Sequence, residues 1–249
     1  MIMSLKEDII KKTKEYHDEK FTFDKATSIP TVNTKQLTFG CKGWIFDAVV
    51  LYIDMRHSTQ LLDDHKRNVV AKLHMSYYNA IVRIAKVDGG EIRSFNGDSL
   101  LVFYWGKDTT TVDKAVRSAF RMKYAIDELV NPNLEGYKDI NFGIGIDMGN
   151  IIATKVGIGG DDTTKDLIWL GNAVNRSTKI SDKCEAPYHV GISESVFNKL
   201  PDTLKVYKTK QQNIFGIQEI KHEVWIRQIM VYNNDWEAFY TSSCTLRFE

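Results

Sequence analysis

Apolar and polar positions alternate along this chain in two periods, one typical of strands and one typical of helices. A nearly continuous apolar run over residues 45–54 predicts a central strand buried on both faces. Strict alternation over residues 140–148 predicts a half-buried strand, and Gly149-Asn150 is expected to turn it into another strand over 151–156. Shorter apolar runs predict further strands at 91–93, 99–104, 167–170, 190–193, 204–207 and 222–227.

Apolar residues at helical spacing predict a long helix from Ser58, as its N-cap, to about Val87. The same spacing predicts helices over about 111–130 and 172–183, and a surface or partner-facing helix within the charged residues 4–20. Residues 21–40 read as an irregular connection. Asn96-Gly97 is a strong hairpin dipeptide and is expected to join the strands on either side of it.

The order of these elements is strand, helix, two strands, helix and further strands. This is the split βαβ pattern of ferredoxin-like α+β folds, an antiparallel-rich sheet with helices on one face. We expect an N-terminal helix and connection at residues 1–40, a main domain at 41–230 and a C-terminal tail at 231–249. The pattern assigns no structure to the tail from Asn233 onward.

Charge and cysteine content narrow the class of protein. The chain has 33 basic and 32 acidic residues, so its net charge of +1 gives no reason to expect binding to nucleic acid or to an anionic membrane surface. Cys41, Cys184 and Cys244 match no zinc or redox spacing and are expected to be free thiols in a reducing cytosol. The N-terminus lacks a signal-peptide stretch, and no apolar run approaches the ~20 residues of a membrane span. We expect a soluble, cytoplasmic protein without membrane insertion.

Two aspartates at strand ends are the first candidates for chemistry. Asp54 ends the apolar run over 45–54, and Asp98 follows Asn96-Gly97. Carboxylates at the ends of adjacent strands are well placed to hold Mg²⁺ against a triphosphate. The loop amides before Ser58 and Thr59 lie at a helix N-terminus, which favours a phosphate. Each residue also has a plain structural interpretation: Asp54 as a solubilising loop residue, Asp98 as an ordinary turn residue, and Ser58 as a cap.

Asn175 and Lys179 form a second candidate group. They are four residues apart on the helix predicted after Gly171-Asn172, so they share one face. An amide and a cation projecting together could hold a ribose and a phosphate. The alternative is a solvated helix face without a ligand.

In this order and spacing, the segments Tyr52–Thr59, Arg93–Asp98 and Trp169–Lys179 resemble the motifs of class III nucleotidyl cyclases over about residues 45–227. The resemblance makes 41–230 a cyclase catalytic domain and implies a head-to-tail homodimer with two shared sites. Asp54 and Asp98, with the backbone carbonyl of Met55, would hold two Mg²⁺ or Mn²⁺ ions per site. Asn175 would orient the ribose. The resemblance implies that each site takes its metal aspartates from one chain and Asn175, Lys179 and the base-reading residues from the other. Lys179 stands where the family has arginine, which keeps the charge but loses the bidentate fork.

The chain departs from the family's motifs at the positions of the residues that recognise the nucleotide base. Purine cyclases of this class place a lysine four residues before the second metal aspartate, where this chain has Ser94. They place an aspartate, threonine or cysteine three residues before the glycine of the third motif, where it has Ile168. With the metal aspartates retained, the chain looks like the pyrimidine cyclases of bacterial Pycsar anti-phage systems. By that resemblance Tyr52 would contact the base, although a core aromatic is the alternative.

The resemblance implies a phosphorus–oxygen lyase that converts UTP or CTP to its 3′,5′-cyclic monophosphate and pyrophosphate. The product would be a second messenger for a separate effector in anti-phage defence. The substrate contacts would be Tyr52, Ser58, Thr59, Ser94 and Ile168. Two alternatives stay open: a purine cyclase with atypical base contacts, and an inactive nucleotide-binding homologue. UTP and CTP differ only at the C4 edge, and no residue here is a decisive reader of that edge.

Overall fold

A long strand, β2, organises the fold and carries Asp54 near its end. The structure is a computed structural model that describes residues 4–161, 163–213 and 216–248. It divides into a larger unit of residues 47–149 and 172–249 and a smaller unit of residues 1–46 and 150–171. This division differs from the boundaries expected near residues 40 and 230, which remain predictions about domains.

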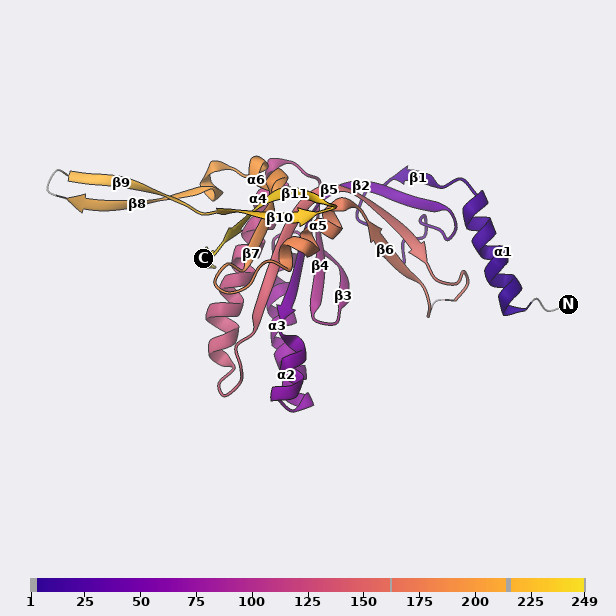
Figure 1. Ribbon diagram of the computed structural model, residues 1–249, viewed down its shortest axis with the longest axis horizontal. Helices are drawn as coiled ribbons and strands as arrows, with labels where there is room; N and C mark the ends of the chain where they lie inside the picture. The colour runs from indigo at the N-terminus through magenta and orange to yellow at the C-terminus, as the bar shows by residue number, and fades with distance from the viewer. Residues whose placement is uncertain (1–3, 162, 214–215, 249) are drawn as a thin grey trace. The chain divides into compact units, whose positions relative to one another are not determined.

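The strands and helices are labelled in Figure 1. The strands are β1 (Thr22–Lys25), β2 (Lys42–Arg56), β3 (Glu91–Asn96), β4 (Ser99–Trp105), β5 (Asn141–Val156), β6 (Asp166–Leu170), β7 (Val190–Ser193), β8 (Val206–Asn213), β9 (Gly216–Glu223), β10 (Ile226–Tyr232) and β11 (Asp235–Ser242). The helices are α1 (Leu5–Asp18), α2 (Ser58–Asp64), α3 (Arg67–Val87), α4 (Thr109–Tyr124), α5 (Asn172–Ser181) and α6 (Glu194–Lys199). A π-helical turn, Ala125–Val130, extends α4, and short 3₁₀ turns cover Asn131–Asn133 and Asp202–Leu204.

The larger unit contains a ferredoxin-like sheet, as the element order predicts. Its strands lie in the order β10-β11-β7-β5-β2-β4-β3. The central four strands, β5-β2-β4-β3, follow the chain as strand, helix, two strands, helix and strand, which is the split βαβ arrangement. Strand β4 pairs antiparallel with both β2 and β3, and β5 pairs parallel with β7. The predicted α+β fold is therefore confirmed.

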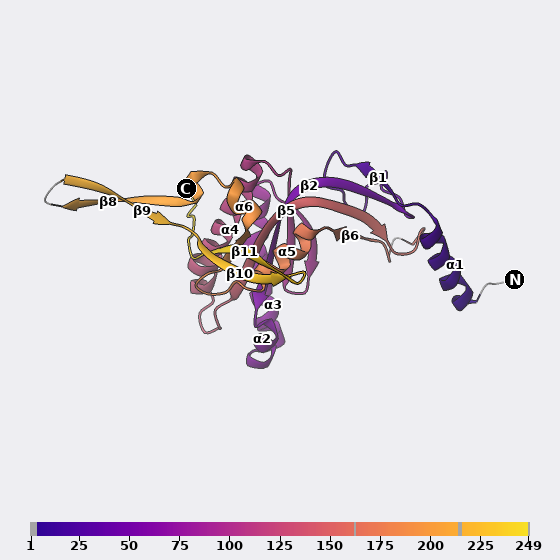
Figure 2. The same ribbon diagram turned by 45° about the horizontal axis from the view of Figure 1, so that its top comes forward.

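The main hydrophobic core lies between this sheet and the paired helices α3 and α4, which Figure 2 shows on one side of the strands. Alternate side chains of β2 and β5 point into this core, and the apolar faces of α3 and α4 pack against them. The core residues that are fully buried include Leu51, Ile53, Leu73, Tyr77, Ile81, Val112, Ala119, Phe142, Ile144 and Ile146. Because the chain turns from strand to helix directly after this core, Asp54 is fixed at its border.

Helix α5 packs on the other face of the sheet, contrary to the expectation of helices on one face only. Gly143 and Gly145 of β5 make this possible: a Cβ atom at Gly145 would collide with the backbone of Ser177 and Ser181. The absence of side chains at Gly143 and Gly145 lets the helix approach closely at these two positions. A second core forms here from Ile180 and Cys184 with Met230, Tyr232 and Phe239 of the β10–β11 hairpin.

The smaller unit extends the two long strands. Strand β1 pairs parallel with residues 42–45 of β2, and β6 pairs antiparallel with residues 152–156 of β5. Helix α1 begins with a capping box in which Ser4 accepts from the backbone of Glu7, and none of its residues is buried. The predicted exposed helix within 4–20 is therefore confirmed, whereas the expected irregular connection contains a short strand.

Three local predictions are wrong. The helix expected over 58–87 is broken into α2 and α3, because His65 is extended at the end of α2 and its ring packs edge-on against Tyr137. Ser58 does not cap it: the N-cap is His57, which makes no side-chain cap bond. Gly149-Asn150 does not end the strand: residues 141–156 form the single strand β5, which has β2, β7 and β6 as its partners.

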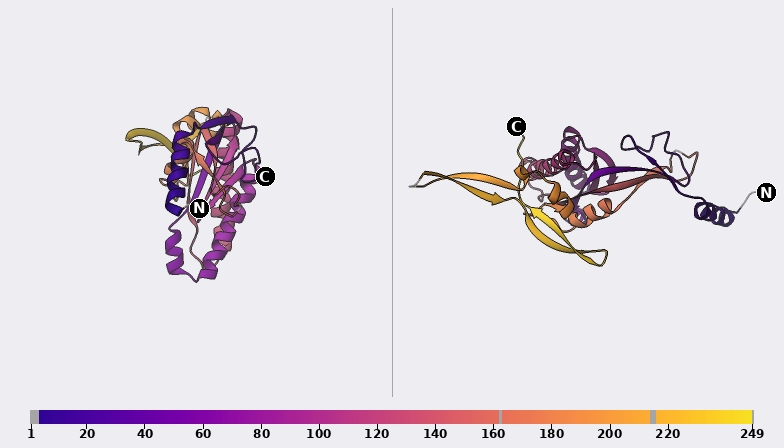
Figure 3. Two further views of the ribbon diagram at one scale, coloured as in Figure 1. Left: turned by 90° about the vertical axis from the view of Figure 1, so that its right-hand side faces the viewer. Right: turned by 90° about the horizontal axis from the view of Figure 1, so that it is seen from above.

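The C-terminal region is also more ordered than the sequence pattern indicates. Residues 235–242 form β11, which joins the sheet between β10 and β7. Figure 3 shows the β10–β11 hairpin and the separate β8–β9 ribbon from above. All three cysteines are free thiols, as predicted. Among the described residues, no helix is both long enough and apolar enough to span a bilayer.

Candidate active site

Asp54 and Asp98 are brought together by the antiparallel pairing of β2 with β4. Asp54 lies opposite Ser99 in this register, and Asp98 directly precedes Ser99 at the turn. Asn96 also pairs with Ser99, so Gly97 and Asp98 are the two central residues of the hairpin turn. Gly97 has a φ of 66°, a conformation that glycine adopts readily at the first position of such a turn. The turn therefore presents the carboxyl group of Asp98 beside that of Asp54.

The two carboxyl groups repel each other. Burial, and then the negative charge of Asp98, raise the pKa of Asp54 to about 6, while the guanidinium of Arg56 opposes the rise. A cation between the two groups would relieve this repulsion. No three His, Cys, Asp or Glu side chains converge anywhere in the described ranges, so a cation here would depend on these two carboxylates and on further oxygens.

Met55 can contribute only through its backbone. Its side chain is buried in the core on the opposite side of β2 from Asp54, as strand alternation requires. Two carboxylates and a carbonyl form an oxygen-only donor set, which suits Mg²⁺ or Mn²⁺. The residues present thus fit the predicted cation, and their role as ligands stays a prediction.

Tyr78 of α3 holds the turn between β3 and β4 through hydrogen bonds, a role that the sequence analysis did not predict. Its hydroxyl donates to the carbonyl of Gly97 at 2.8 Å and to that of Ser99 at 3.3 Å. Burial and the nearby carboxylates raise the pKa of Tyr78 to about 12, so it remains a neutral donor. The sequence signal for this role is that Tyr78 directly follows the core residue Tyr77. An aromatic residue next to the apolar stripe of a helix lies at the border of the core, where it can reach a neighbouring loop.

Tyr52 and Ser94 lie in one row across the sheet. Leu101 of β4 is paired with Tyr52 on one side and with Ser94 on the other, so the three side chains project from the same face. This is also the face of Asp54, two residues after Tyr52. A bulge at Arg93, between Ile92 and Ser94, sets this alignment. The row Tyr52–Leu101–Ser94 offers a ring, an apolar side chain and a hydroxyl next to the carboxylates.

Ser58 and Thr59 lie at the start of α2, three to four residues beyond Met55. Ser58 is half-buried and Thr59 is exposed. His57 before them adopts a left-handed conformation with a φ of 58°. This single residue turns the chain sharply from β2 into α2, so both hydroxyl side chains follow the strand end closely.

Asn175 and Lys179 share the exposed face of α5, as predicted, because Ala173, Ser177 and Ile180 face the sheet. The ammonium group of Lys179 lies 4.0 Å from the carboxylate of Asp182, with both side chains solvated. Such a pair is weak in water, so Lys179 is available for another anion. The structure presents both side chains outward, where a second molecule can meet them.

Ile168 is the one predicted contact that lies in the smaller unit. It is on β6, paired with Thr154 of β5, and its side chain is 39% exposed. Tyr52, Asp54, Ser94 and Asp98 are thus gathered within the larger unit, and Ile168 is not among them.

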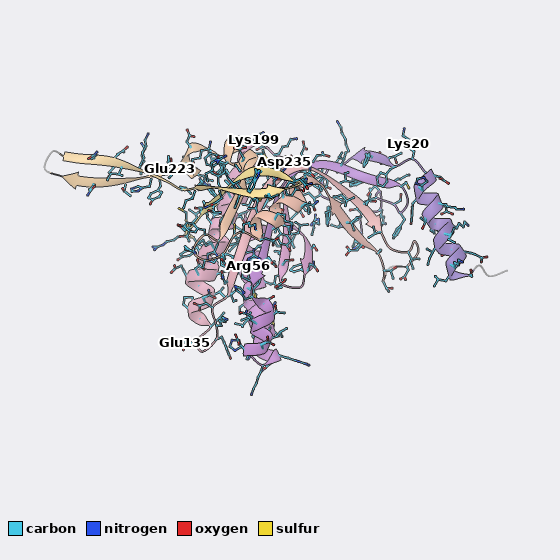
Figure 4. All side chains as sticks on the ribbon, in the orientation of Figure 1. Lys20, Arg56, Glu135, Lys199, Glu223 and Asp235 are labelled. Atoms are coloured by element: carbon cyan, nitrogen blue, oxygen red, sulfur yellow. The ribbon has the colours of Figure 1, made fainter. Side chains whose placement is uncertain are left out.

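Arg56 is the second functional residue that sequence reasoning missed. It follows Asp54 by two residues on the same strand face, and its Nη1 donates to the Asp54 carboxylate at 2.9 Å. Figure 4 labels Arg56 where β2 leads into α2. The spacing of an arginine two residues after a strand-end aspartate was the available signal for this ion pair.

Comparison with known proteins finds proteins of similar sequence. No family model matches the chain. A protein named uridylate cyclase from Xanthomonas perforans is 26% identical over 90% of this chain and 98% of its own length. A uridylate cyclase from Burkholderia cepacia is 27% identical over 82% of this chain and 87% of its own length.

Solved structures give the fold. The guanylyl cyclase Cya2 matches with a TM-score of 0.64 and 18% identity over 81% of this chain and 93% of its own. The adenylyl cyclase CyaB from P. aeruginosa matches with a TM-score of 0.64 and 20% identity, over 82% of this chain and 97% of its own. A class III adenylyl cyclase-like ATP-binding protein from Pseudomonas aeruginosa matches with a TM-score of 0.63 and 20% identity, over 82% of this chain and 46% of its own. The resemblance predicted from the three motifs is confirmed: the chain is similar in sequence to uridylate cyclases over most of its length and has the catalytic-domain fold of the class III nucleotide cyclases.

Proposed function

We propose that this protein is a pyrimidine nucleotide cyclase that converts UTP, ahead of CTP, to the 3′,5′-cyclic monophosphate and pyrophosphate. One observation carries the proposal: the chain presents the paired carboxylates Asp54 and Asp98 and also, for the site that it would share with a second copy, a row, Tyr52–Leu101–Ser94, that contains no charged reader of a purine. The uridylate cyclases matched over most of the chain support the same base.

The reaction forms one bond and breaks one. The ribose 3′-oxygen attacks the α-phosphorus in line, the bond from that phosphorus to the bridging oxygen breaks, and pyrophosphate leaves while the 3′-hydroxyl loses its proton. Two divalent cations held by Asp54, Asp98 and the Met55 carbonyl would lower the pKa of that hydroxyl and neutralise the triphosphate. Ser58 and Thr59 lie where the triphosphate would extend past the strand end. The chain's own contribution is thus to position the reacting groups and balance their charge.

Asn175 and Lys179 would complete the site from a second copy of the chain, together with the base-reading residues of that copy. Their exposed position on α5 supports this, because both side chains point to solvent in the single chain. In a head-to-tail homodimer, the amide of Asn175 would hold the ribose and the ammonium group of Lys179 would stabilise charge on the α-phosphate. Each dimer would have two such shared sites.

The row Tyr52–Leu101–Ser94 argues for a pyrimidine on polarity. Burial raises the pKa of Tyr52, so its hydroxyl stays protonated and can donate to a base carbonyl. Ser94 adds a second small polar group in the same row. A purine would lack its usual charged partners, and an unpaired polar edge costs roughly 1–3 kcal/mol. Ile168 stands at the motif position of the second purine reader and carries no polar group.

The biological setting follows the same resemblance. We infer a cytoplasmic enzyme whose cyclic product is a second messenger for a separate effector in anti-phage defence. The relatives named uridylate cyclase support the cyclic product, and the setting itself rests on the resemblance of the three motifs.

Product identity tests the proposed activity. We expect the purified protein, incubated with UTP and Mn²⁺, to release 3′,5′-cyclic UMP and pyrophosphate in equal amounts, identified by chromatography and mass spectrometry. Chelation with EDTA should stop the reaction, because the carboxylates alone cannot neutralise a triphosphate. Binding of nucleotides without any cyclic product from the four triphosphates would show an inactive homologue instead.

A further inference from the structure

One arginine connects the strand that carries Asp54 with the helix that carries Asn175 and Lys179. Arg56 donates from Nη1 to the Asp54 carboxylate at 2.9 Å. Its Nε donates to the carbonyl of Cys184 at 3.1 Å, and its Nη2 donates to the hydroxyl of Ser181 at 3.2 Å and to the Ser181 carbonyl. The guanidinium therefore holds the Asp54 carboxylate on one side, and Ser181 at the end of α5 and Cys184 just beyond it on the other.

The surroundings are built to hold this side chain. Arg56 is 15% exposed, and a Cβ atom at Gly143 would collide with its guanidinium and with the carbonyls of Ser181 and Cys184 that it binds. The Ser181 hydroxyl donates in turn to the Gly143 carbonyl at 2.9 Å. The last carbonyls of a helix have no partners within it and carry partial negative charge, so a buried cation there is stabilising. Lysine could not make all of these bonds, because it lacks the planar fork.

The ends of this connection belong to different catalytic sites if the proposed function holds. Asp54 of one chain would act with Asn175 and Lys179 of the other, so within one chain Arg56 bridges two sites. We propose, resting on the proposed function, that Arg56 is a positioning residue that couples the metal-binding half of one site to the α5 half of the other. The contacts in the single chain carry this inference, since they join β2 to α5 directly.

Arg56 would act on Asp54 and on the end of α5, and its replacement is expected to change two properties in opposite directions: Mn²⁺ affinity rises and kcat falls. The guanidinium neutralises part of the Asp54 charge and competes with a divalent cation, so its loss should tighten Mn²⁺ binding about threefold to tenfold. The same loss frees the end of α5, and misplacement of Asn175 and Lys179 should lower kcat about tenfold to a hundredfold. A residue with a merely structural role would weaken both properties together.

The test compares Arg56→Gln with Arg117→Gln in the full-length protein. Arg117 is a matched control because its salt bridge to Asp113 lies within α4, apart from β2 and α5. Mn²⁺ binding is measured by the electron paramagnetic resonance of free Mn²⁺ without nucleotide, and kcat by cyclic UMP formation. We expect tighter Mn²⁺ binding with lower kcat for Arg56→Gln and no change for Arg117→Gln. Unchanged values, or a joint loss of Mn²⁺ binding and kcat, would overturn the proposal.

A second measurement separates the two ends of the connection. Mixed dimers of an Asp54→Ala chain and an Asn175→Ala chain contain one composite site, so Arg56→Gln can be placed in either chain. It should lower kcat when placed in the Asp54→Ala chain, which supplies α5, and tighten Mn²⁺ binding when placed in the other. The same effect from both placements would contradict the coupling.

Three outcomes can be distinguished: a variant that does not fold, a protein that is not a cyclase, and an Arg56 that does not couple the two half-sites. If Arg56→Gln does not fold, Arg56→Lys is measured instead; it should keep near-normal Mn²⁺ affinity but lose kcat, and an unchanged kcat would overturn the proposal. If the wild-type protein forms no cyclic product, the proposed function fails. The Mn²⁺ affinity and the hydrogen exchange of the α5 amides then still test whether Arg56 joins the two elements: tighter binding and faster exchange in Arg56→Gln support it, and unchanged values overturn it.

Discussion

Replacing Asp54 or Asp98 by alanine is expected to abolish cyclisation while leaving a folded protein. The two carboxylates are the only acidic groups that the hairpin turn brings together at the end of β2, within the described residues. Removing one takes away a ligand that neutralises the triphosphate and activates the 3′-hydroxyl, an effect of several kcal/mol. Since about 1.4 kcal/mol changes a rate tenfold, we expect a loss of about a thousandfold or more.

The fold should survive because Asp54 and Asp98 destabilise each other. Each variant removes a repulsion that, after burial, raises the pKa of Asp54 to about 6. The measurements are the rate of cyclic UMP formation, the thermal unfolding midpoint and the circular dichroism spectrum. Asp63→Ala, which removes an exposed carboxylate on α2, is the control and should keep full activity. Near-normal turnover in either Asp54→Ala or Asp98→Ala would show that the metal assignment is wrong.

Asn175→Ala and Lys179→Ala should each lose most of the turnover with little loss of stability, because both side chains are exposed on α5. The loss of one positioned hydrogen-bond donor or charge at the transition state typically costs about a hundredfold to a thousandfold. Mixing an Asp54→Ala chain with an Asn175→Ala chain should restore activity. Half of the dimers formed at random would be mixed, and each would have one intact site of two, so about a quarter of wild-type activity is expected.

The control for this rescue is a mixture of Asp54→Ala and Asp98→Ala chains. Both substitutions fall in the same half of the site, so every site in that mixture lacks a carboxylate. It should show no recovery. Equal activity in the two mixtures, or no recovery in the first, would argue that the site is not shared between chains.

Much of this fold could be predicted because its elements have strong local signals. The apolar run over 45–54, the alternation over 140–148 and the turn at Gly97 each correspond to a strand or hairpin in the structure. The ordered motifs also gave the fold family, which the structural comparisons confirm.

The wrong predictions share a physical cause, which is that tertiary contacts override local signals. Gly149-Asn150 is a good turn sequence, but residues 141–156 form the single strand β5, which has β2, β7 and β6 as its partners. Residues 235–242 lack clear alternation, and β11 forms because β10 and β7 pair with it on both sides. Helix α5 reaches the opposite face of the sheet through the missing side chains of Gly143 and Gly145, a packing effect without a periodic signal.

The candidate site was predicted in part for the same reason. Asp54 and Asp98 stand at strand ends that the sequence marks, so their placement followed from local pattern. The contacts of Arg56 with Ser181 and Cys184 span more than a hundred residues, and no local pattern indicates them. The alignment of Tyr52 with Ser94 depends on a bulge at Arg93, which only the strand register shows.

Competition among the four nucleoside triphosphates tests the central claim most directly. The wild-type protein is given UTP, CTP, ATP and GTP together at equal concentration with Mn²⁺, and the initial rates of the four cyclic products are measured in one mixture. The ratio of these rates equals the ratio of kcat/KM values. We predict cyclic UMP as the main product, with cyclic CMP second and the purine products about tenfold to a hundredfold slower, as the unpaired purine edge implies. A faster rate for cyclic AMP or cyclic GMP than for cyclic UMP would contradict the pyrimidine assignment and establish a purine cyclase with atypical base contacts.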